Sequence, residues 1–238
     1  NIDTGMGLER LVCLIQDGET NFDTDLFLPI IHATEQYAKH PYSEKEYKMA
    51  YRVIADHIRT VTFAIADGAM FSNEGRGYVL RRVLRRAVRY GIKLGIDGAF
   101  MYKLVKVVAD NMIAYYPYVQ EKVALIEKLV KQEEESFHKT LANGEALLQD
   151  ALAEHADTKI LPGEVMFKLY DTYGYPKELT TEIAEEEGYR VDSEGFDKEM
   201  QAQKTRAREA RGNIQSMHGQ SADLMDFTQE SKFTGYTD

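Results

Sequence analysis

Residues 77–90 read GYVLRRVLRRAVRY, and this stretch decides the class of fold. Apolar residues recur in it at intervals of three and four, which is the period of an amphipathic α-helix. They are Leu80, Val83, Leu84, Ala87 and Val88. Arginines occupy the opposite face, at Arg81, Arg82, Arg85, Arg86 and Arg89. The stretch therefore predicts a helix that packs by one face and carries five positive charges on the other.

This row of arginines has two interpretations. Like charges three and four residues apart repel one another by about 0.2–0.5 kcal/mol per pair in an isolated helix, and a polyanion such as RNA would relieve that repulsion. Alternatively, carboxylates elsewhere in the chain neutralise some of the arginines in salt bridges. The charge distribution permits both, because the segment from Arg52 to Lys93 holds nine basic and three acidic residues in a chain of net charge −10.

The rest of the chain also has helical periodicity, so we predict a mainly α fold. The expected helices cover residues 8–16, 23–39, 43–67, 102–116, 119–155, 162–170, 178–187 and 193–211. Ser43 followed by Glu46 predicts a capping box for the third of these, and the run from Lys131 to Glu135 predicts a solvent-exposed charged face. Beyond Gly212 the composition indicates a linker, and a strand is expected at residues 232–236.

Composition narrows the class of protein. A chain of 238 residues with 44% hydrophobic content can bury a sizeable core, and no apolar run is long enough to cross a membrane. Cys13 is the only cysteine, so there is no internal disulfide and we expect a cytoplasmic location. The six histidines are scattered without ligand spacing, so no metal site is predicted. Because the chain starts inside a glycine-rich motif without an initiator methionine, we expect a piece excised from a longer protein.

The N-terminal motif is DTGMGLER, residues 3–10. Gly5 and Gly7 would let the backbone approach a ligand closely, and Arg10 on the following helix could place its guanidinium on a phosphate. By itself the spacing is weak evidence, since an ordinary helix start with a surface arginine has the same pattern.

Two polar residues lie in turn-like strings. Asn73 belongs to SNEGRG at residues 72–77, and Asp171 belongs to LYDTYGYP at residues 169–176. From spacing alone we favour a capping role for both, with Asn73 at the start of the arginine-rich helix and Asp171 at a helix end.

Taken together and in this order, the three strings resemble the alanine-specific class II aminoacyl-tRNA synthetases, from Asn1 to about Arg211. The first string is similar to motif 3 of their catalytic domain, and the other two are similar to segments of their tRNA-recognition domain. The resemblance implies a multi-helix tRNA-recognition domain at residues 19–213, preceded by the last turn and helix of the catalytic domain at residues 1–18. Residues 214–238 would be a linker and the start of a β editing domain.

The resemblance also implies roles for particular residues. Arg10 would bind the γ-phosphate of ATP above a floor made by Gly5 and Gly7, and Asp3, with Gly5, would hold the alanine substrate. Asn73 and Asp171 would read a G·U wobble pair in the acceptor stem of tRNA(Ala), with the five arginines of residues 81–89 along the RNA. ATP and magnesium would serve the full-length enzyme, none is expected to bind this piece alone, and zinc would belong only to the editing domain.

Physical chemistry supports the wobble-pair readout. The minor groove of A-form RNA is wide and shallow, and in a G·U pair the guanine 2-amino group there lacks a Watson–Crick partner. The Asp171 carboxylate can accept a hydrogen bond from that amine, and the Asn73 amide can both donate and accept beside it. A G·C pair would leave the carboxylate short of a donor, at a cost of about 1–3 kcal/mol.

Two other readings remain open at this point. The chain could be a stand-alone helical RNA-binding module without catalysis, or a helical scaffold that docks a protein partner. Under the leading reading the chain alone is not expected to activate alanine, because motif 3 supplies only one side of an ATP site.

Overall fold

The computed structural model describes residues 5–210, with side chains through Arg206, and in that part of the chain it is mainly α, which confirms the predicted class. The helices are α1 (Leu8–Ile15), the 3-10 turn η1 (Asn21–Asp23), α2 (Leu28–Glu35), α3 (Lys48–Ala66), α4 (Gly75–Lys93), α5 (Met101–Met112), α6 (Pro117–Glu121), α7 (Val123–Glu154), α8 (Gly163–Asp171), α9 (Lys177–Glu186) and α10 (Ser193–Ala210). Two short strands, β1 (Ile160–Leu161) and β2 (Arg190–Val191), pair in parallel.

The chain divides into two compact units, one through Phe196 and one from Asp197 onward. The description below concerns the first unit. The predicted strand at residues 232–236 and the predicted linker lie outside the described residues, and the predicted boundaries at residues 18 and 213 stay predictions.

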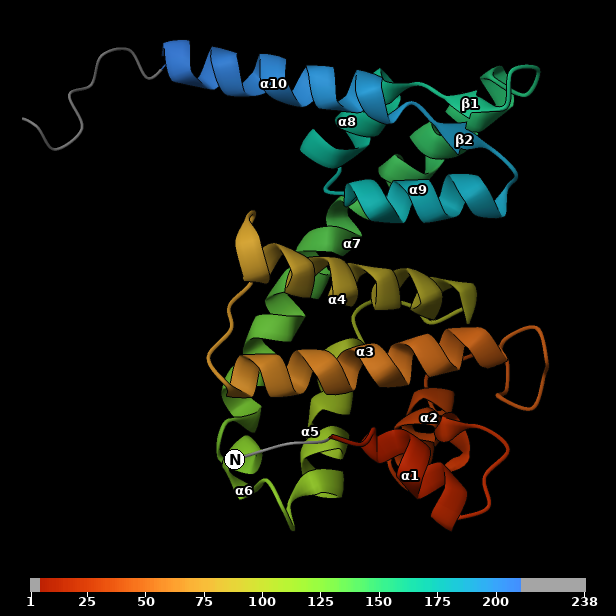
Figure 1. Ribbon diagram of the computed structural model, residues 1–238, viewed down its shortest axis with the longest axis vertical. Coiled ribbons are helices and arrows are strands. Elements are labelled where there is room, and N and C mark those ends of the chain that lie inside the picture. The colour runs from red at the N-terminus through yellow and green to blue at the C-terminus, as the bar shows by residue number, and fades with distance from the viewer. Residues whose placement is uncertain (1–4, 211–238) are drawn as a thin grey trace, which may run out of the picture. The chain divides into compact units, whose positions relative to one another are not determined.

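The core of the first unit is a layered stack of helices. α3 and α4 run side by side, and α5 packs against both α3 and α7 (Figure 1). The apolar faces meet at fully buried residues such as Ile54, Ile58, Leu84 and Leu104. α7, with 32 residues, spans about 48 Å and also contacts α4, α8 and β1, so one helix touches most of the others.

Several predicted helix boundaries are wrong, including the helix ends expected at residues 39 and 116, which lie at Glu35 and Met112. The helix expected from residue 23 begins only at Leu28, because Thr20 and Asp23 form a capping box around the short turn η1. The capping box expected at Ser43 does not form, since residues 45–47 form a turn and α3 starts at Lys48 with no side-chain cap. The helix expected over residues 119–155 is divided at Lys122 into α6 and α7.

The charged run from Lys131 to Glu135 is not the solvent-exposed face that its composition predicted. Lys131 and Glu135 are exposed, but Glu133 is only 9% exposed and Glu134 is fully buried. Each buried carboxylate has partners on another helix, and these partners offset the cost of taking a charged group out of water. A pattern based on one helix alone could not show them.

Glu134 caps a helix other than its own. Its carboxylate accepts hydrogen bonds from the backbone N–H of Phe100 at 2.9 Å and of Met101 at 3.1 and 3.2 Å, at the start of α5. These groups have no partner within α5, and the positive end of its dipole favours a carboxylate. Burial nevertheless raises the pKa of Glu134 to about 7, against the effect of these N–H groups.

Replacement of Glu134 by Gln should change the pH dependence of stability. Between the ordinary pKa of 4.5 and about 7 the folded protein holds a proton that the unfolded chain releases, so the wild type loses stability as pH rises through this window. Gln keeps an acceptor for the α5 N–H groups and does not titrate. We therefore expect the melting temperature of Glu134→Gln minus that of wild type to rise by several degrees from pH 5 to pH 8.5.

Both proteins in this comparison should carry His138→Gln. The His138 Nε2 atom lies 3.9 Å from Glu134 Oε1 and would otherwise titrate in the same range. A melting-temperature difference that stays constant with pH would contradict the assignment.

Candidate RNA interface

The loop before α4 folds back over the first turn of that helix. A side chain at Gly77 would collide with the carbonyl oxygen of Met70, so only glycine permits this close approach. Asn73 is exposed in this loop, and its Oδ1 atom accepts a hydrogen bond from Arg81 Nη1. The N-cap of α4 is Glu74, with no side-chain capping bond, so the capping role expected for Asn73 from spacing is wrong.

Every arginine of residues 81–89 has a carboxylate partner. The ion pairs are Arg81 Nε–Glu133 Oε1 at 3.0 Å, Arg82 Nη1–Glu178 Oε1 at 2.9 Å, Arg85 Nη2–Glu133 Oε1 at 2.6 Å, Arg86 Nη2–Glu182 Oε1 at 2.5 Å and Arg89 Nη1–Glu186 Oε2 at 3.6 Å. Salt bridges therefore account for the whole arginine row, which is the alternative interpretation of its spacing. Binding of RNA phosphates by these arginines stays a prediction.

The pairs divide into an inner and an outer group. Arg81 and Arg85 meet Glu133 of α7, and their side chains are only 20% and 12% exposed. The other three arginines meet glutamates of α9 that are 26–48% exposed and spaced by one helical turn. The inner pairs are thus largely removed from water, whereas the outer pairs are screened by it.

The ionisation of these groups follows their surroundings. Burial lowers the pKa of Arg85, and the charge of Glu133 opposes this effect. At Glu182 burial works to raise the pKa, but the hydrogen bond from Arg86 and its charge outweigh burial, so the pKa of Glu182 is lowered.

Asp171 is the last residue of α8 and is exposed. The turn after it is held from two sides. Gly174 adopts a φ of +70°, which favours glycine, and its carbonyl accepts a hydrogen bond from Arg85 Nη1. Tyr175 is fully buried, and its hydroxyl donates to the carbonyl of Leu141 on α7 at 3.1 Å. The role expected for Asp171 at this helix end stays a prediction.

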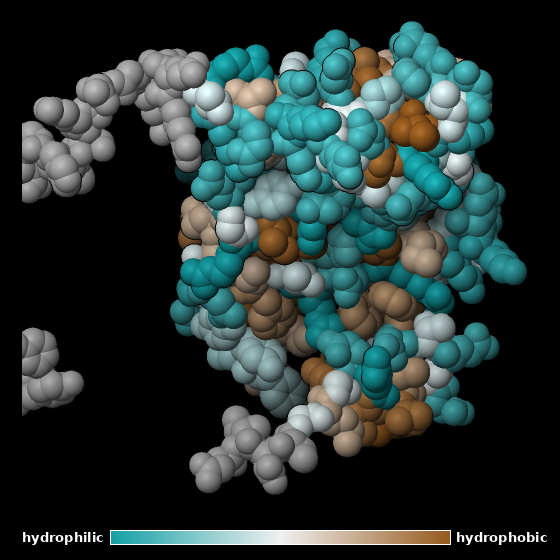
Figure 2. Space-filling model, turned by 45° about the horizontal axis from the view of Figure 1, so that its top comes forward, coloured by the Kyte–Doolittle hydropathy of each residue, from teal (hydrophilic) through white to brown (hydrophobic). Residues whose placement is uncertain are grey.

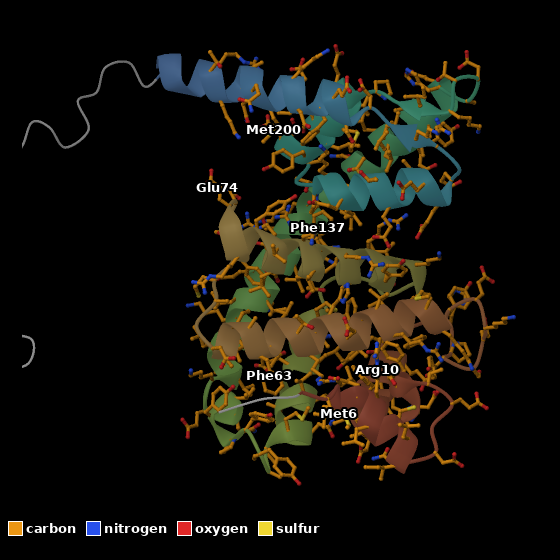
Figure 3. The ribbon with its side chains drawn as sticks, in the orientation of Figure 1. Met6, Arg10, Phe63, Glu74, Phe137 and Met200 are labelled. Atoms are coloured by element: carbon orange, nitrogen blue, oxygen red, sulfur yellow. The ribbon has the colours of Figure 1, made fainter. Side chains whose placement is uncertain are left out.

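The structure brings the surroundings of Asn73 and Asp171 together, although 98 residues separate them in sequence. Hydrogen bonds and ion pairs run without a break from Asn73 to Arg81, Glu133 and Arg85, and on to the carbonyl of Gly174. Phe137 lies beside this path, where α7 passes α4 (Figure 3).

The N-terminal motif is open to solvent in its described part. Gly5, Gly7 and Arg10 are all exposed, nothing lies within 4 Å of where a Gly5 side chain would start, and Figure 3 shows Met6 and Arg10 on the α1 segment. Asp3 lies outside the described residues. Next to α1, a cavity of about 350 Å³ is lined by Glu9, Arg59, Phe63 and Tyr116, and Glu9 pairs with Arg59 at 2.5 Å.

α1 also exposes an apolar surface. Met6, Leu14 and Ile15 are 76%, 80% and 74% exposed, and Figure 2 shows an apolar patch on the part of the surface where Figure 1 places α1. No helix of the described residues is long and apolar enough to cross a membrane. The same residues hold no group of three or more His, Cys, Asp or Glu that could bind a metal ion.

A family model described as tRNA synthetases class II (A) matches residues 1–238. The chain belongs to this synthetase family. Among similar proteins, the alanine–tRNA ligase of Enterococcus faecalis is 55% identical over 246 residues, which cover 100% of this chain and 28% of that protein. The alanine–tRNA ligases of Geobacillus kaustophilus and Bacillus velezensis are each 56% identical, over 99% and 100% of this chain and 27% of their own length. The chain thus spans just over a quarter of these synthetases.

Sequence reasoning missed the acidic half of this part of the synthetase. Glu178, Glu182 and Glu186 follow one another at four-residue spacing, which places them on one face of α9 opposite the arginines. The four-residue spacing of these glutamates, which matches the spacing of Arg82 and Arg86, was the signal in the sequence that could have indicated the pairing. Nothing comparable identified Glu133, because a single glutamate in a charged run looks the same whether it faces water or another helix.

Gly174→Ala should destabilise the protein more than Gly188→Ala. Both glycines have positive φ, +70° and +78°, so the backbone penalty is similar, about 1 kcal/mol. Only at Gly174 would the new methyl group lie 2.5 Å from Arg85 Nη1, whereas nothing lies near Gly188. We expect an additional loss of about 1–2 kcal/mol at Gly174, measured by urea unfolding. Equal losses would show that the Arg85 contact does not hold the turn.

Proposed function

We propose that this chain forms the tRNA-recognition part of an alanine–tRNA ligase, which joins alanine to tRNA(Ala) through an alanyl-adenylate. The observation that carries the proposal is the continuous bonded path between the Asn73 loop and the Asp171 turn. Asn73 lies at one end of this path, and the other end, the carbonyl of Gly174, is three residues after Asp171. The path thus ties together the two segments whose short polar side chains would contact one base pair. The names of the similar proteins support the ligase activity.

The contact of Asn73 with Arg81 determines what Asn73 offers to RNA. Its Oδ1 atom already accepts one hydrogen bond from the guanidinium, and both N–H groups of its amide can donate to an acceptor in the minor groove or to a ribose 2′-hydroxyl. Asp171 supplies the complementary acceptor, for the free 2-amino group of guanine in a G·U pair. A donor and an acceptor side by side would distinguish this pair from G·C by hydrogen bonding alone.

The outer arginines, Arg82, Arg86 and Arg89, are proposed to contact phosphates of the acceptor stem. Their glutamate partners on α9 are partly exposed, so a phosphate could replace a carboxylate at modest cost. Arg81 and Arg85 pair with Glu133, which is more deeply buried than the glutamates of α9, and they would add positive potential rather than direct contacts.

Alanine activation is proposed for the N-terminal motif. The exposed backbone at Gly5 and Gly7 leaves room for a nucleotide, Arg10 would hold the γ-phosphate, and Asp3, with Gly5, would hold the alanine. ATP, bound with magnesium, would supply the adenylyl group. The exposed apolar side of α1 supports the assignment of residues 1–18 to a catalytic domain that covers it. A cytoplasmic location is proposed with this activity.

Asp171→Ala and Asn73→Ala should each reduce the preference for a G·U over a G·C acceptor stem. Loss of one base contact costs about 1–3 kcal/mol, which is roughly a 5- to 150-fold change in the ratio of the two dissociation constants. Affinity for the G·C stem should change little, because Asp171 and Asn73 carry only the discrimination. The measurement is an electrophoretic titration of the 238-residue chain with both stems.

Glu164→Ala provides a control, since it removes one exposed carboxylate from the same helix as Asp171. If Asp171→Ala and Asn73→Ala lower the melting temperature but preserve the G·U preference, both residues are structural and the proposal fails.

The phosphate contacts predict a change in salt dependence. Arg82→Ala combined with Arg86→Ala should weaken binding of the G·U and G·C stems equally and flatten the plot of log affinity against log salt by about 0.7–0.9 per lost contact. The matched variant Glu178→Gln with Glu182→Gln frees the same arginines and should increase affinity. An unchanged slope in the arginine variant would leave the salt bridges as the whole role of these residues.

A further inference from the structure

Glu133 lies at the centre of the bonded path between two recognition elements, the Asn73 loop and the turn after Asp171. Its Oε1 atom lies 3.0 Å from Arg81 Nε and accepts hydrogen bonds from Arg85 Nε at 2.9 Å and Nη2 at 2.6 Å. The side chain is only 9% exposed. A carboxylate removed from water this far is stable only with charged partners, and here two guanidinium groups share one carboxylate oxygen. Arg85 hydrogen-bonds to this oxygen, whereas Arg81 Nε lies at ion-pair distance without making a hydrogen bond.

Each of these two arginines reaches a different recognition element with its remaining N–H groups. Arg81 Nη1 donates to Asn73 Oδ1, and Arg85 Nη1 donates to the carbonyl of Gly174, three residues after Asp171. The buried carboxylate of Glu133 therefore orients two guanidinium groups. The Arg81 group holds the Asn73 loop, and the Arg85 group holds the turn after Asp171. The planar guanidinium makes this possible, because it presents several donors in fixed directions.

The Asp171 side of this arrangement is rigid. The Arg85 guanidinium lies 5.0 Å from the centre of the Phe137 ring, and that ring meets Tyr175 edge-on at 5.6 Å. Thr140 adds a hydrogen bond to the carbonyl of Tyr173 at 2.7 Å. Glu133, Phe137 and Thr140 all belong to α7, so this helix is the common base on which the turn rests.

We propose that Glu133 is a positioning residue that sets the spacing between the Asn73 loop and the Asp171 turn, and thereby the discrimination of the wobble pair. The inference rests on the proposed function of Asn73 and Asp171. Glu133 itself contacts no RNA in this scheme. It acts through Arg81 on one side and through Arg85 on the other.

The test uses Glu133→Gln and Arg81→Lys in the 238-residue chain. Gln has the same shape as Glu but lacks the charge that orients both guanidinium groups. Lys keeps the charge of Arg81 but has a single nitrogen, which cannot contact Glu133 and Asn73 in the way the guanidinium does. Glu135→Gln is the matched control, because Glu135 is exposed on the same helix and pairs only loosely with Lys131, at 3.8 Å.

Amide hydrogen exchange and NMR measure the positioning without RNA. The N–H groups of Thr172 and Tyr175 are hydrogen-bonded to the carbonyls of Lys168 and Leu169, so their exchange reports on the turn after Asp171, and the NMR signal of the Asn73 side-chain amide reports on the loop. Glu133→Gln should speed exchange at residues 172–175 and shift the Asn73 signal, Arg81→Lys should shift only the Asn73 signal, and Glu135→Gln should change neither. If Glu133→Gln leaves both readouts as in the wild type, or changes them no more than Glu135→Gln does, the positioning role is overturned.

Binding measures the consequence for recognition. Glu133→Gln and Arg81→Lys should each lower the ratio of G·C to G·U dissociation constants by about 5- to 10-fold, with the affinity for the G·C stem within about twofold of wild type. An intact ratio in a variant whose exchange or Asn73 signal has changed would overturn the link from Glu133 to discrimination. If the wild type itself binds both stems equally, the proposed function fails, and the exchange and NMR data still decide whether Glu133 holds the two elements.

Discussion

The interaction on which the rest of the structure depends is the pairing of five arginines of α4 with glutamates of two other helices. Without partners these arginines would repel one another along one helix face. With Glu133 on α7 and a row of glutamates on α9, the same charges become the means by which α4 holds two helices that come much later in the chain. The acidic net charge of the protein is consistent with this use of its basic helix.

The inner and outer ion pairs differ in burial and therefore in how they respond to competing anions. Around Glu133 water is largely excluded, so the geometry of Arg81 and Arg85 is restricted and the elements they touch are restricted with them. Along α9 the pairs are half-exposed, and salt or another anion can compete for the arginines. The arginine face of α4 thus has one region whose side chains are held in place and another whose anionic partners can be exchanged. Such a surface can keep its shape and still bind a polyanion.

The sequence predicted the mainly α fold, the position of most helices and the face of α4 that packs, because these depend on local periodicity. It could not predict that all five arginines of residues 81–89 have carboxylate partners, since the glutamates concerned lie between residues 133 and 186. Glu134 shows the same limit, because its partners are backbone N–H groups at the start of α5. The sequence around Glu134 does not indicate that the start of α5 lies there. Asn73 and Asp171 came from family resemblance, and their local spacing suggested only capping.

Neighbouring residues on α7 tie it to two different helices, since Glu133 faces α4 and Glu134 faces the start of α5. Successive side chains on an α-helix point about 100° apart, so this double attachment fixes the rotation of α7 about its own axis. Eleven residues further on, Gly144 fits against the ring of Tyr175 and relies on the same rotation. Insertion of a single residue between Glu134 and Gly144 would turn the second attachment away from the first. An insertion of seven residues, close to two helical turns, would restore the rotation but move Gly144 about 10 Å along the helix axis, so this part of α7 is fixed in length as well as in rotation.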